Sequence, residues 1–382
     1  MNTLKIFLLH SFVFFIVACG HNTKQTTEPN IVLNIDFPKE ERHINLSELV
    51  DSISFIRLQT NDSCRIGSID KLIVAENFFL IVDKSLASSI LLFDTNGKFI
   101  NSIGSRGRSQ KEYISIEDVT IGDGKIFVLD SKGNKIISYS IEGEYLEYFP
   151  FDMTAYFFKH IEGKRFAFSC EYSKNYELVQ NGMLPNFLIY DFETKQIVKS
   201  DMYFNSEVSN AAYPVSLNNL SPYMYQIFSN DIYKVSKDGL IPFFHMNYPS
   251  KYKKNMEEYN KMVSQNRITI NESEKVMKAK PFPKLITFFD CGNMFFSFIV
   301  NETKLYYNFY YHIENRLIQA VSSKGIPLED DIYNSLVVIP QASFKGNLFY
   351  AENIDNISNI EGLSEMHDED NPVIVKLYMK KR

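Results

Sequence analysis

The sequence has no tryptophan and only four cysteines among its 382 residues. Propeller blades of the WD type carry a tryptophan in their repeat signature, so blades of that type are excluded. Three cysteines lie outside the N-terminal segment, at Cys64, Cys170 and Cys291, and they are too far apart for a CxxC metal or redox site. We expect isolated, partly buried thiols; one disulfide with a leftover thiol is the alternative.

An excess of basic charge is also missing. The chain has 40 basic and 46 acidic side chains, which gives a net charge of −6. A nucleic-acid-binding protein needs a basic face, so no nucleic-acid partner is expected. What the chain does have is 32 phenylalanines and 23 tyrosines, residues that favour β-strands.

The N-terminus indicates export and lipidation. Lys5 precedes an almost wholly apolar run at 6–18, which is too short to span a bilayer and is typical of a secretory leader. The run ends at Ile16-Val17-Ala18-Cys19-Gly20, which resembles the lipobox of bacterial lipoproteins. We therefore expect residues 1–18 to be a lipoprotein signal peptide and Cys19 to be the lipidated residue. An ordinary signal peptide with a chance cysteine is the alternative.

The residues after Cys19 are expected to form a tether. Residues 20–30 are polar and lack long apolar side chains, which is typical of a flexible linker. Surface-exported lipoproteins of some Gram-negative anaerobes carry acidic residues directly after the cysteine, but here the first acid is Glu28. We expect a lipid-anchored outer-membrane protein, on the periplasmic face rather than the cell surface, with residues 19–44 as tether and first strand.

One unit occurs twice in the next part of the chain. Residues 72–104 and 118–149 both read as two strands, an aspartate, a polar gap and two more strands. The aspartates that end the second strands are Asp83 and Asp130, 47 residues apart. We expect both to accept hydrogen bonds from turn N–H groups and to be structural.

Weaker copies of the unit follow and predict an all-β fold. They lie at 166–202, 225–245 and 295–321. A sixth unit at 347–379 needs partner strands, which the N-terminal strands at 31–37 and 53–58 could supply. The prediction is a six-bladed β-propeller over residues 45–382, built of four-stranded antiparallel blades and closed between the two ends of the chain. A pair of β-sandwiches is the alternative.

A polar insertion at 249–283 interrupts the repeats. Residues 252–266 predict one amphipathic helix, and residues 251–284 carry nine basic and four acidic side chains. A solvated helix on a surface loop is expected; docking of a partner or of lipid headgroups is the alternative.

The segment 103–113, IGSRGRSQKEY, carries a family resemblance. It resembles the G-x-x-G-x-G-P-x-E-[YF] loop of six-bladed, NHL-like propeller lipoproteins of Gram-negative anaerobes. Segments 46–58, 96–100 and 371–373 resemble other parts of that family in the same order. The resemblance implies the fold and the lipid anchor, but no activity. Ser109-Gln110 stands where the family usually has Gly-Pro.

The same loop is the candidate ligand site. Glycine N–H groups flanked by cations can cradle an anion. The candidate residues are Gly104, Arg106, Gly107, Arg108, Lys111 and Glu112. The loop lacks the Gly-Lys-Ser/Thr of a P-loop, so nucleotide hydrolysis is not indicated. A connector between blades, with its charges paired internally, is the alternative.

No catalytic residue, metal or cofactor is nominated. His160, His245 and His312 lie in successive repeats and could converge on a zinc ion, as in propeller-shaped lyases related to NHL repeats. The acidic run at 365–370 lacks the glycine and the spacing of a calcium loop. No catalytic triad is evident.

The expected function is therefore that of a non-catalytic envelope lipoprotein that binds a glycan, a peptide or a protein partner. A lyase or hydrolase acting on polysaccharide or peptide in the central channel is the alternative. A sensor or assembly partner that uses the basic insertion is a third possibility. Three histidines, or two carboxylates about 5–10 Å apart at the channel mouth, would favour the enzyme.

Overall fold

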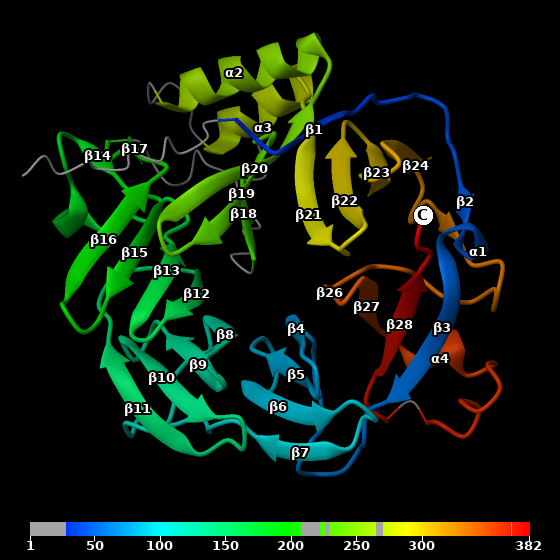
Figure 1. Cartoon of the computed structure of the whole chain (residues 1–382), viewed down its shortest axis with the longest axis horizontal. Coiled ribbons are helices and arrows are strands. Elements are labelled where there is room, and N and C mark those ends of the chain that lie inside the picture. The colour runs from blue at the N-terminus through cyan, green and yellow to red at the C-terminus, as the bar shows by residue number, and fades with distance from the viewer. Residues whose placement is uncertain (1–27, 208–221, 227–228, 265–269, 368) are drawn as a thin grey trace, which may run out of the picture.

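The structure is a computed structural model that describes residues 28–207, 222–226, 229–264, 270–367 and 369–382. Six four-stranded sheets stand around a central axis and form a closed ring (Figure 1). The predicted six-bladed propeller is confirmed. The leader and Cys19 lie outside the described residues.

Four blades are built from one continuous stretch of chain each. Blade one is β4 (Lys71–Val74), β5 (Phe78–Asp83), β6 (Ser89–Asp94) and β7 (Phe99–Ser102). Blade two is β8 (Asp118–Gly122), β9 (Lys125–Asp130), β10 (Lys135–Ser140) and β11 (Tyr145–Pro150). Blade three is β12 (Phe157–Glu162), β13 (Arg165–Ser169), β15 (Phe187–Asp191) and β16 (Gln196–Asp201). Blade five is β21 (Lys284–Asp290), β22 (Met294–Asn301), β23 (Lys304–Tyr311) and β24 (Arg316–Ser322).

The other two blades each borrow a strand from the N-terminal region. Blade four is β18 (Tyr223–Tyr225), β19 (Asp231–Ser236), β20 (Gly239–Asn247) and β1 (Ile31–Asn34). Blade six is β26 (Ala342–Phe344), β27 (Asn347–Glu352), β28 (Val373–Met379) and β3 (Val50–Arg57). Smaller elements are α1 (Leu46–Leu49), α4 (Ile354–Ile357), η1 (Tyr176–Leu178), and the pairs β2 (Ile44–Asn45) with β25 (Leu328–Glu329) and β14 (Met183–Leu184) with β17 (Phe204–Asn205).

The second strands are the most deeply buried elements of the first two blades. In β5 and β9 every residue after the first is buried. A strand that is covered by the neighbouring blades on both faces needs a continuous apolar run rather than an alternating pattern. The outer strand β16, in contrast, is exposed over its first four residues.

The ring closes in blade six, where β3 pairs antiparallel with β28. This is the use predicted for the strand at 53–58. The prediction that residues 31–37 could also join this blade is wrong, because β1 pairs parallel with β20 in blade four, with Ile31 opposite Phe244. Leu33 and Ile35 are buried there, in the apolar cluster shared by blades four and five. Burial of those two side chains accounts for the position of β1.

Blade four runs in the opposite direction to its neighbours. The Tyr223 hydroxyl donates to Asp290 Oδ2 at the end of β21, over 2.6 Å. The Tyr225 hydroxyl donates to the Ile286 carbonyl near the start of β21, over 3.3 Å. Therefore β18 runs antiparallel to β21, although both are innermost strands. After three strands β20 ends on the face where β21 begins, which leaves the outer position open for β1.

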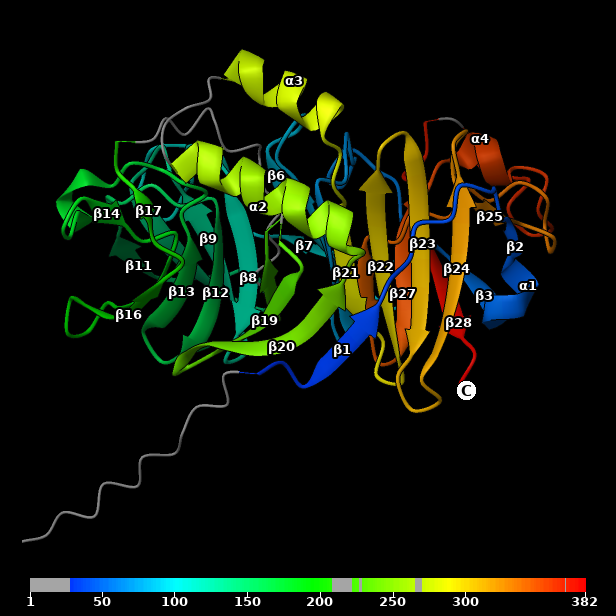
Figure 2. The same ribbon diagram turned by 90° about the horizontal axis from the view of Figure 1, so that it is seen from above.

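The insertion between β20 and β21 contains two helices, α2 (Ser250–Ser264) and α3 (Ile270–Ala279), rather than the single helix predicted. Both lie at the rim of the ring in Figure 1, and Figure 2 shows α2 alongside the ring and α3 projecting beyond one of its faces. A small core of Met256, Tyr259 and Phe282 holds them. The end of the predicted helix falls outside the described residues.

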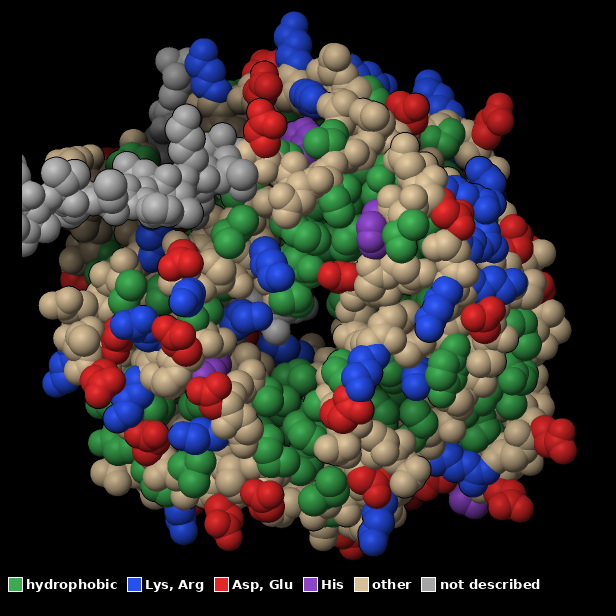
Figure 3. All heavy atoms as spheres, viewed as in Figure 1, with side chains coloured by type: hydrophobic (Ala, Val, Ile, Leu, Met, Phe, Trp, Pro, Cys, Tyr) green, Lys and Arg blue, Asp and Glu red, His purple; other side chains and the backbone are tan. Residues whose placement is uncertain are grey.

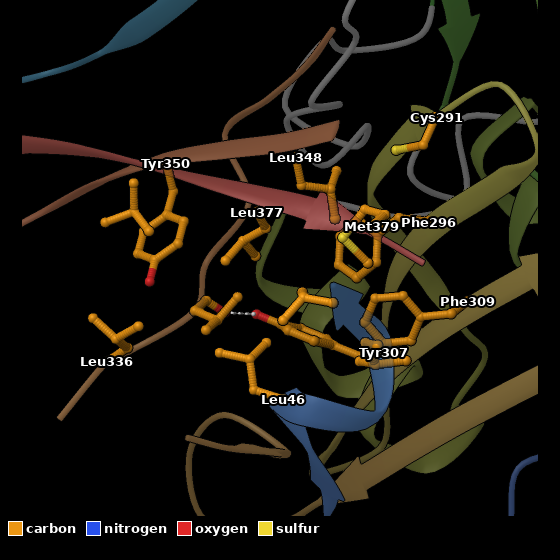
Figure 4. Close-up of a cluster of buried hydrophobic side chains, with 14 of the residues drawn as sticks. Leu46, Cys291, Phe296, Tyr307, Phe309, Leu336, Leu348, Tyr350, Leu377 and Met379 are labelled. Carbon is orange, nitrogen blue, oxygen red and sulfur yellow. Dashed lines mark hydrogen bonds between the residues drawn. The ribbon is translucent and has the colours of Figure 1, made fainter. Parts of the chain in front are cut away.

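The largest core lies between blades five and six (Figure 4). Tyr307 packs against Phe296, with ring centroids 5.1 Å apart, and its hydroxyl donates to the Val338 carbonyl over 3.2 Å. Leu46 of α1 lies on the same cluster. The N-terminal segment thus completes this core as well as the sheet of blade six.

Candidate functional site

The chain links that join the outer strand of one blade to the inner strand of the next define what we call the connector face. Because each regular blade has four antiparallel strands, these links lie on the same side of the ring, at 58–70, 103–117, 151–156 and 323–341. The opposite side, with the tight turn between β4 and β5, is called the hairpin face. The candidate loop at 104–112 therefore lies on the connector face.

Buried carboxylates hold these links in place. Asp83 is fully buried, and it accepts hydrogen bonds from the N–H groups of Gly67 and Ser68 in one link and of Leu86 and Ala87 in its own blade. Burial alone would raise the pKa of Asp83, but the four N–H donors outweigh it and hold the pKa below its ordinary value. The structural role expected for Asp83 is confirmed.

Blade two repeats this arrangement. Asp130 accepts from the N–H groups of Ile114 and Ser115, which continue the candidate loop, and from Gly133. In blade six a glutamate, Glu352, ends the second strand and accepts from the N–H of Val337. A carboxylate at the end of the second strand is thus a shared device for fixing the link.

The candidate loop already contains an anion of its own. The Glu112 carboxylate accepts a hydrogen bond from the Ser109 N–H over 2.9 Å. Hydrogen bonds from the backbone and side chain of Ser109 lower the pKa of Glu112. A Cβ added to Gly107 would lie 2.1 Å from Glu112 Oε2, so the glycine makes room for the carboxylate. The predicted backbone cradle is therefore occupied by Glu112.

The three cations of the loop form no close ion pair among the described residues. Arg106, Arg108 and Lys111 are all exposed, and none is within 4.0 Å of a carboxylate of the described residues. Beneath the loop, the buried Lys135 donates from its Nζ to the Ser109 carbonyl over 2.8 Å. The structure thus brings the predicted residues together and separates their roles: Glu112 fixes the loop, and the cations face solvent. Gly104 has a positive φ of 64° and packs against Tyr139.

The axis of the ring is open, with acidic and basic side chains at the rim of the opening (Figure 3). Two cavities lie along it. The one toward the connector face has a volume of about 310 Å³, and the one toward the hairpin face about 190 Å³. The connector-side cavity is lined by aromatic side chains and polar groups, which include Phe157, Tyr225, Phe289, Asp70, Thr287 and Gln341.

The charged groups that line the two cavities already have partners. Lys71 forms an ion pair with the buried Asp118 over 2.8 Å and also donates to the Val119 carbonyl. The second oxygen of Asp118 accepts from the Phe158 N–H over 3.1 Å. This network joins the inner strands of blades one, two and three. It stabilises the channel wall and leaves no free charge on Asp118.

The two other channel acids are likewise held. Asp70 accepts from the N–H groups of Lys84 and Ser85 and from hydroxyl groups; these bonds outweigh burial and lower its pKa. Asp290 accepts from Tyr223, and burial together with this bond raises the pKa of the tyrosine. Asp70 and Asp290 line different cavities.

The three histidines do not converge. His160 stacks on Phe127 with ring centroids 4.8 Å apart, and its Nε2 lies 3.0 Å from the Gly163 carbonyl. His245 pairs with Asp231 in blade four, and His312 packs against Phe295, 5.2 Å between centroids. The described part of the chain contains no group of three or more ligating side chains that could hold a metal. The described residues of the acidic run at 365–370 form no such group, and Asp368 lies outside the described residues.

The three cysteines are unpaired and buried, so the expectation of isolated thiols is confirmed and the single disulfide is not formed. Burial raises the pKa of Cys64, that of Cys170 to about 12, and that of Cys291 further. Such thiols are protonated at neutral pH and poor nucleophiles.

The residues that line the channel were not predicted from the sequence, because three of the innermost strands were not predicted. The strands β12, β21 and β26 were not predicted, and they carry or adjoin Phe157, Thr287, Phe289 and Gln341. A signal was present, since β26 is joined to β27 by a tight turn at Lys345-Gly346, both with positive φ.

Within the described residues, no helix is both long and apolar enough to cross a membrane.

Comparison with known proteins places the chain in a family. A model of a domain of unknown function, DUF4934, matches residues 30–378, so the chain belongs to that family. No curated protein matches it. A Bacteroides fragilis protein described as exported has a similar structure, with a TM-score of 0.69 and 17% identity over 92% of this chain and 99% of the other. A member of the DUF4221 family from Bacteroides vulgatus gives a TM-score of 0.44 and 12% identity, over 89% and 99%.

Proposed function

We propose that this member of the DUF4934 family is a non-catalytic envelope lipoprotein whose connector-side cavity binds the end of a glycan chain. The observation that carries the proposal is the lining of that cavity, with Phe157, Tyr225 and Phe289 beside the polar groups of Thr287 and Gln341. Sugar rings have an apolar face and a hydroxyl-bearing edge. Aromatic walls with a few fixed polar groups suit both.

The size of the cavity supports a small occupant. A volume of about 310 Å³ is at the lower end of ligand pockets, enough for one or two sugar rings. The walls come from the inner strands of several blades, so the site is held in shape by the whole ring. A rigid site loses little free energy to ordering when the ligand binds.

A hydrolase or lyase is less well supported, because a general acid or base needs a carboxylate or imidazole that can exchange a proton. In this cavity Asp70 is the acid, and its hydrogen bonds to the backbone of Lys84 and Ser85 lower its pKa. Such a carboxylate stays ionised, and its hydrogen bonds to the protein make it a poor proton donor or acceptor for a substrate.

Calorimetric titration of a panel of oligosaccharides against the protein tests binding. Phe157→Ala and Thr287→Val are each expected to weaken the binding of a neutral oligosaccharide about tenfold, which corresponds to about 1.4 kcal/mol. Tyr156→Ala is the matched control, since Tyr156 is exposed and does not line the cavity. Equal affinities for all four proteins, or release of a cleaved product during the titration, would overturn the proposal.

The envelope location rests on the lipobox-like segment at Cys19 and is in keeping with the exported Bacteroides protein of similar fold. Cys19→Ala should release the protein from the membrane fraction into the soluble periplasm. Persistent membrane attachment of that variant would argue against lipidation. Protease treatment of intact cells would then separate the periplasmic face, which we favour, from the cell surface.

A further inference from the structure

We propose that the loop at 104–112 is a second binding site on the connector face, specific for anionic polysaccharide, with Arg106, Arg108 and Lys111 as its contact residues. This inference rests on the proposed glycan-binding function and adds the charge of the glycan. The cavity would hold the end of the chain, and the loop would hold carboxylate or sulfate groups farther along it.

The first argument is the shape of the loop. Its backbone is fixed by hydrogen bonds from Gly107 N–H to the Tyr113 carbonyl and from Tyr113 N–H to the Ser105 carbonyl. The Tyr139 hydroxyl also donates to the Lys111 carbonyl, over 2.8 Å. A loop held in this way presents its cations without a large entropic cost on binding.

The second argument is the charge. Arg106, Arg108 and Lys111 are exposed and lack a carboxylate within 4.0 Å among the described residues, while Lys135 adds a fourth, buried cation below Ser109. Glu112 is the one acid of the loop, and backbone hydrogen bonds occupy it. In a chain with a net charge of −6, such a cluster creates a local positive field.

The third argument is the number of exposed cations on the loop. Exposed ion pairs contribute about 0–1 kcal/mol each, so a single small anion would bind weakly. A polymer that places several anionic groups along the face gains from multivalency. Extended ligands with repeated charge therefore fit this surface better than free phosphate.

The experiment uses the full chain with Cys19→Ala, so that no acyl group takes part. Affinity electrophoresis in gels that contain polygalacturonate, dextran sulfate or neutral dextran measures binding. The triple variant Arg106→Ala, Arg108→Ala, Lys111→Ala is compared with a control that removes the same charge elsewhere, Lys98→Ala, Lys237→Ala, Lys381→Ala, at three exposed lysines outside the loop. We expect the loop variant to lose at least tenfold in affinity for the anionic polymers and the control less than twofold.

A second variant tests the positioning role of Glu112. Gly107→Ala keeps all three cations but places its Cβ against the Glu112 carboxylate, so the carboxylate must leave its position beside Ser109. We expect a loss of about threefold for the anionic polymers with an unchanged melting temperature. Because Gly107→Ala, Glu112→Ala also lacks the bond from the Ser109 N–H to Glu112, we expect its affinity to stay reduced. Full restoration of affinity in this double variant would contradict the positioning role of Glu112.

Three results would overturn the inference: equal losses in the loop variant and its control, no loss in either, or binding to anionic phospholipid vesicles with none to the polymers. The proposed cavity function fails differently: it fails if Phe157→Ala binds neutral oligosaccharide as well as the native protein does. Loss of neutral binding in Phe157→Ala with anionic-polymer binding intact would show that the two sites bind separately. Loss of neutral binding in Phe157→Ala, together with unchanged polymer binding in the loop triple variant, would leave the cavity function standing alone.

Discussion

Blades two and four both have four strands, but blade two is built from one continuous stretch of chain and blade four from two distant ones. Blade two takes its four strands from residues 118–150, joined by tight turns, and Asp130 fixes the link that enters it. Blade four takes three strands from 223–247, runs in the opposite direction, and obtains its outer strand from β1, where Asn34 and Asn247 are 213 residues apart in sequence.

The difference shows that the ring has two ways to complete a sheet. Local connections complete blades one, two, three and five, where the chain arrives on the connector face; blade six, the last along the chain, also arrives there but takes β3 as its outer strand. Where three strands bring the chain back to that face, the outer edge stays open. A distant strand then covers it, which removes an exposed edge that would otherwise pair with other chains. The experiments below compare the stability contributed by the carboxylate clamp of blade two with that contributed by the distant strand of blade four.

The largest expected effect is at the clamp of blade two. Asp130→Ala removes the acceptor of several buried N–H groups and should lower the free energy of unfolding by about 3–5 kcal/mol. Denaturant unfolding followed by circular dichroism measures it. Asp152→Ala, at an exposed acid, is the control and should change stability by less than about 0.5 kcal/mol. A loss in Asp130→Ala as small as that expected for the control would mean that the clamp is dispensable.

Next in size is the borrowed strand of blade four. Leu33→Ala should cost about 2–4 kcal/mol, because Leu33 is only 6% exposed in the shared cluster. Its neighbour Val32 is 54% exposed, and Val32→Ala should change stability by less than about 0.5 kcal/mol. Equal effects of the two changes would contradict the pairing of β1 with β20.

The direction of β18 gives a smaller effect. Tyr223→Phe should cost about 1–2 kcal/mol, since Asp290 Oδ2 loses its hydroxyl donor. In double-mutant cycles with Asp290→Asn, Tyr223 should couple by about 1 kcal/mol and Tyr225 by less than about 0.3 kcal/mol. Coupling through Tyr225 instead would indicate that blade four runs in the same direction as the others.

The last comparison concerns the pH dependence of the clamp of blade one. The folded pKa of Asp83 lies below its unfolded value, so its stabilisation is fully present above the unfolded pKa of about 3.9. It is lost as the pH falls through the folded pKa. The stability difference between the native protein and Asp83→Asn should therefore shrink below about pH 4. A difference that stays constant down to pH 2 would show that the carboxylate charge is not used.

Much of the fold was predictable because its signals are local. The strand–turn–strand units of blades one and two, the aspartates that end β5 and β9, and the closing strand β3 were all expected from the sequence. The candidate loop was also expected, together with its cations. What the spacing of Glu112 did not indicate is that its carboxylate would fill the backbone cradle, since that depends on the path of the loop between Gly107 and Ser109.

The sequence by itself determined the class of the protein, through its alternating and apolar strand runs and its turn residues. Only the tertiary structure decided the direction of blade four, the place of β1, the pairing of Lys71 with Asp118 and the lining of the central channel. The physical reason is the separation along the chain of the residues that interact. Hairpins and caps are set by neighbours along the chain, whereas inner strands only three residues long, such as β18 and β26, are defined by the blades on either side of them.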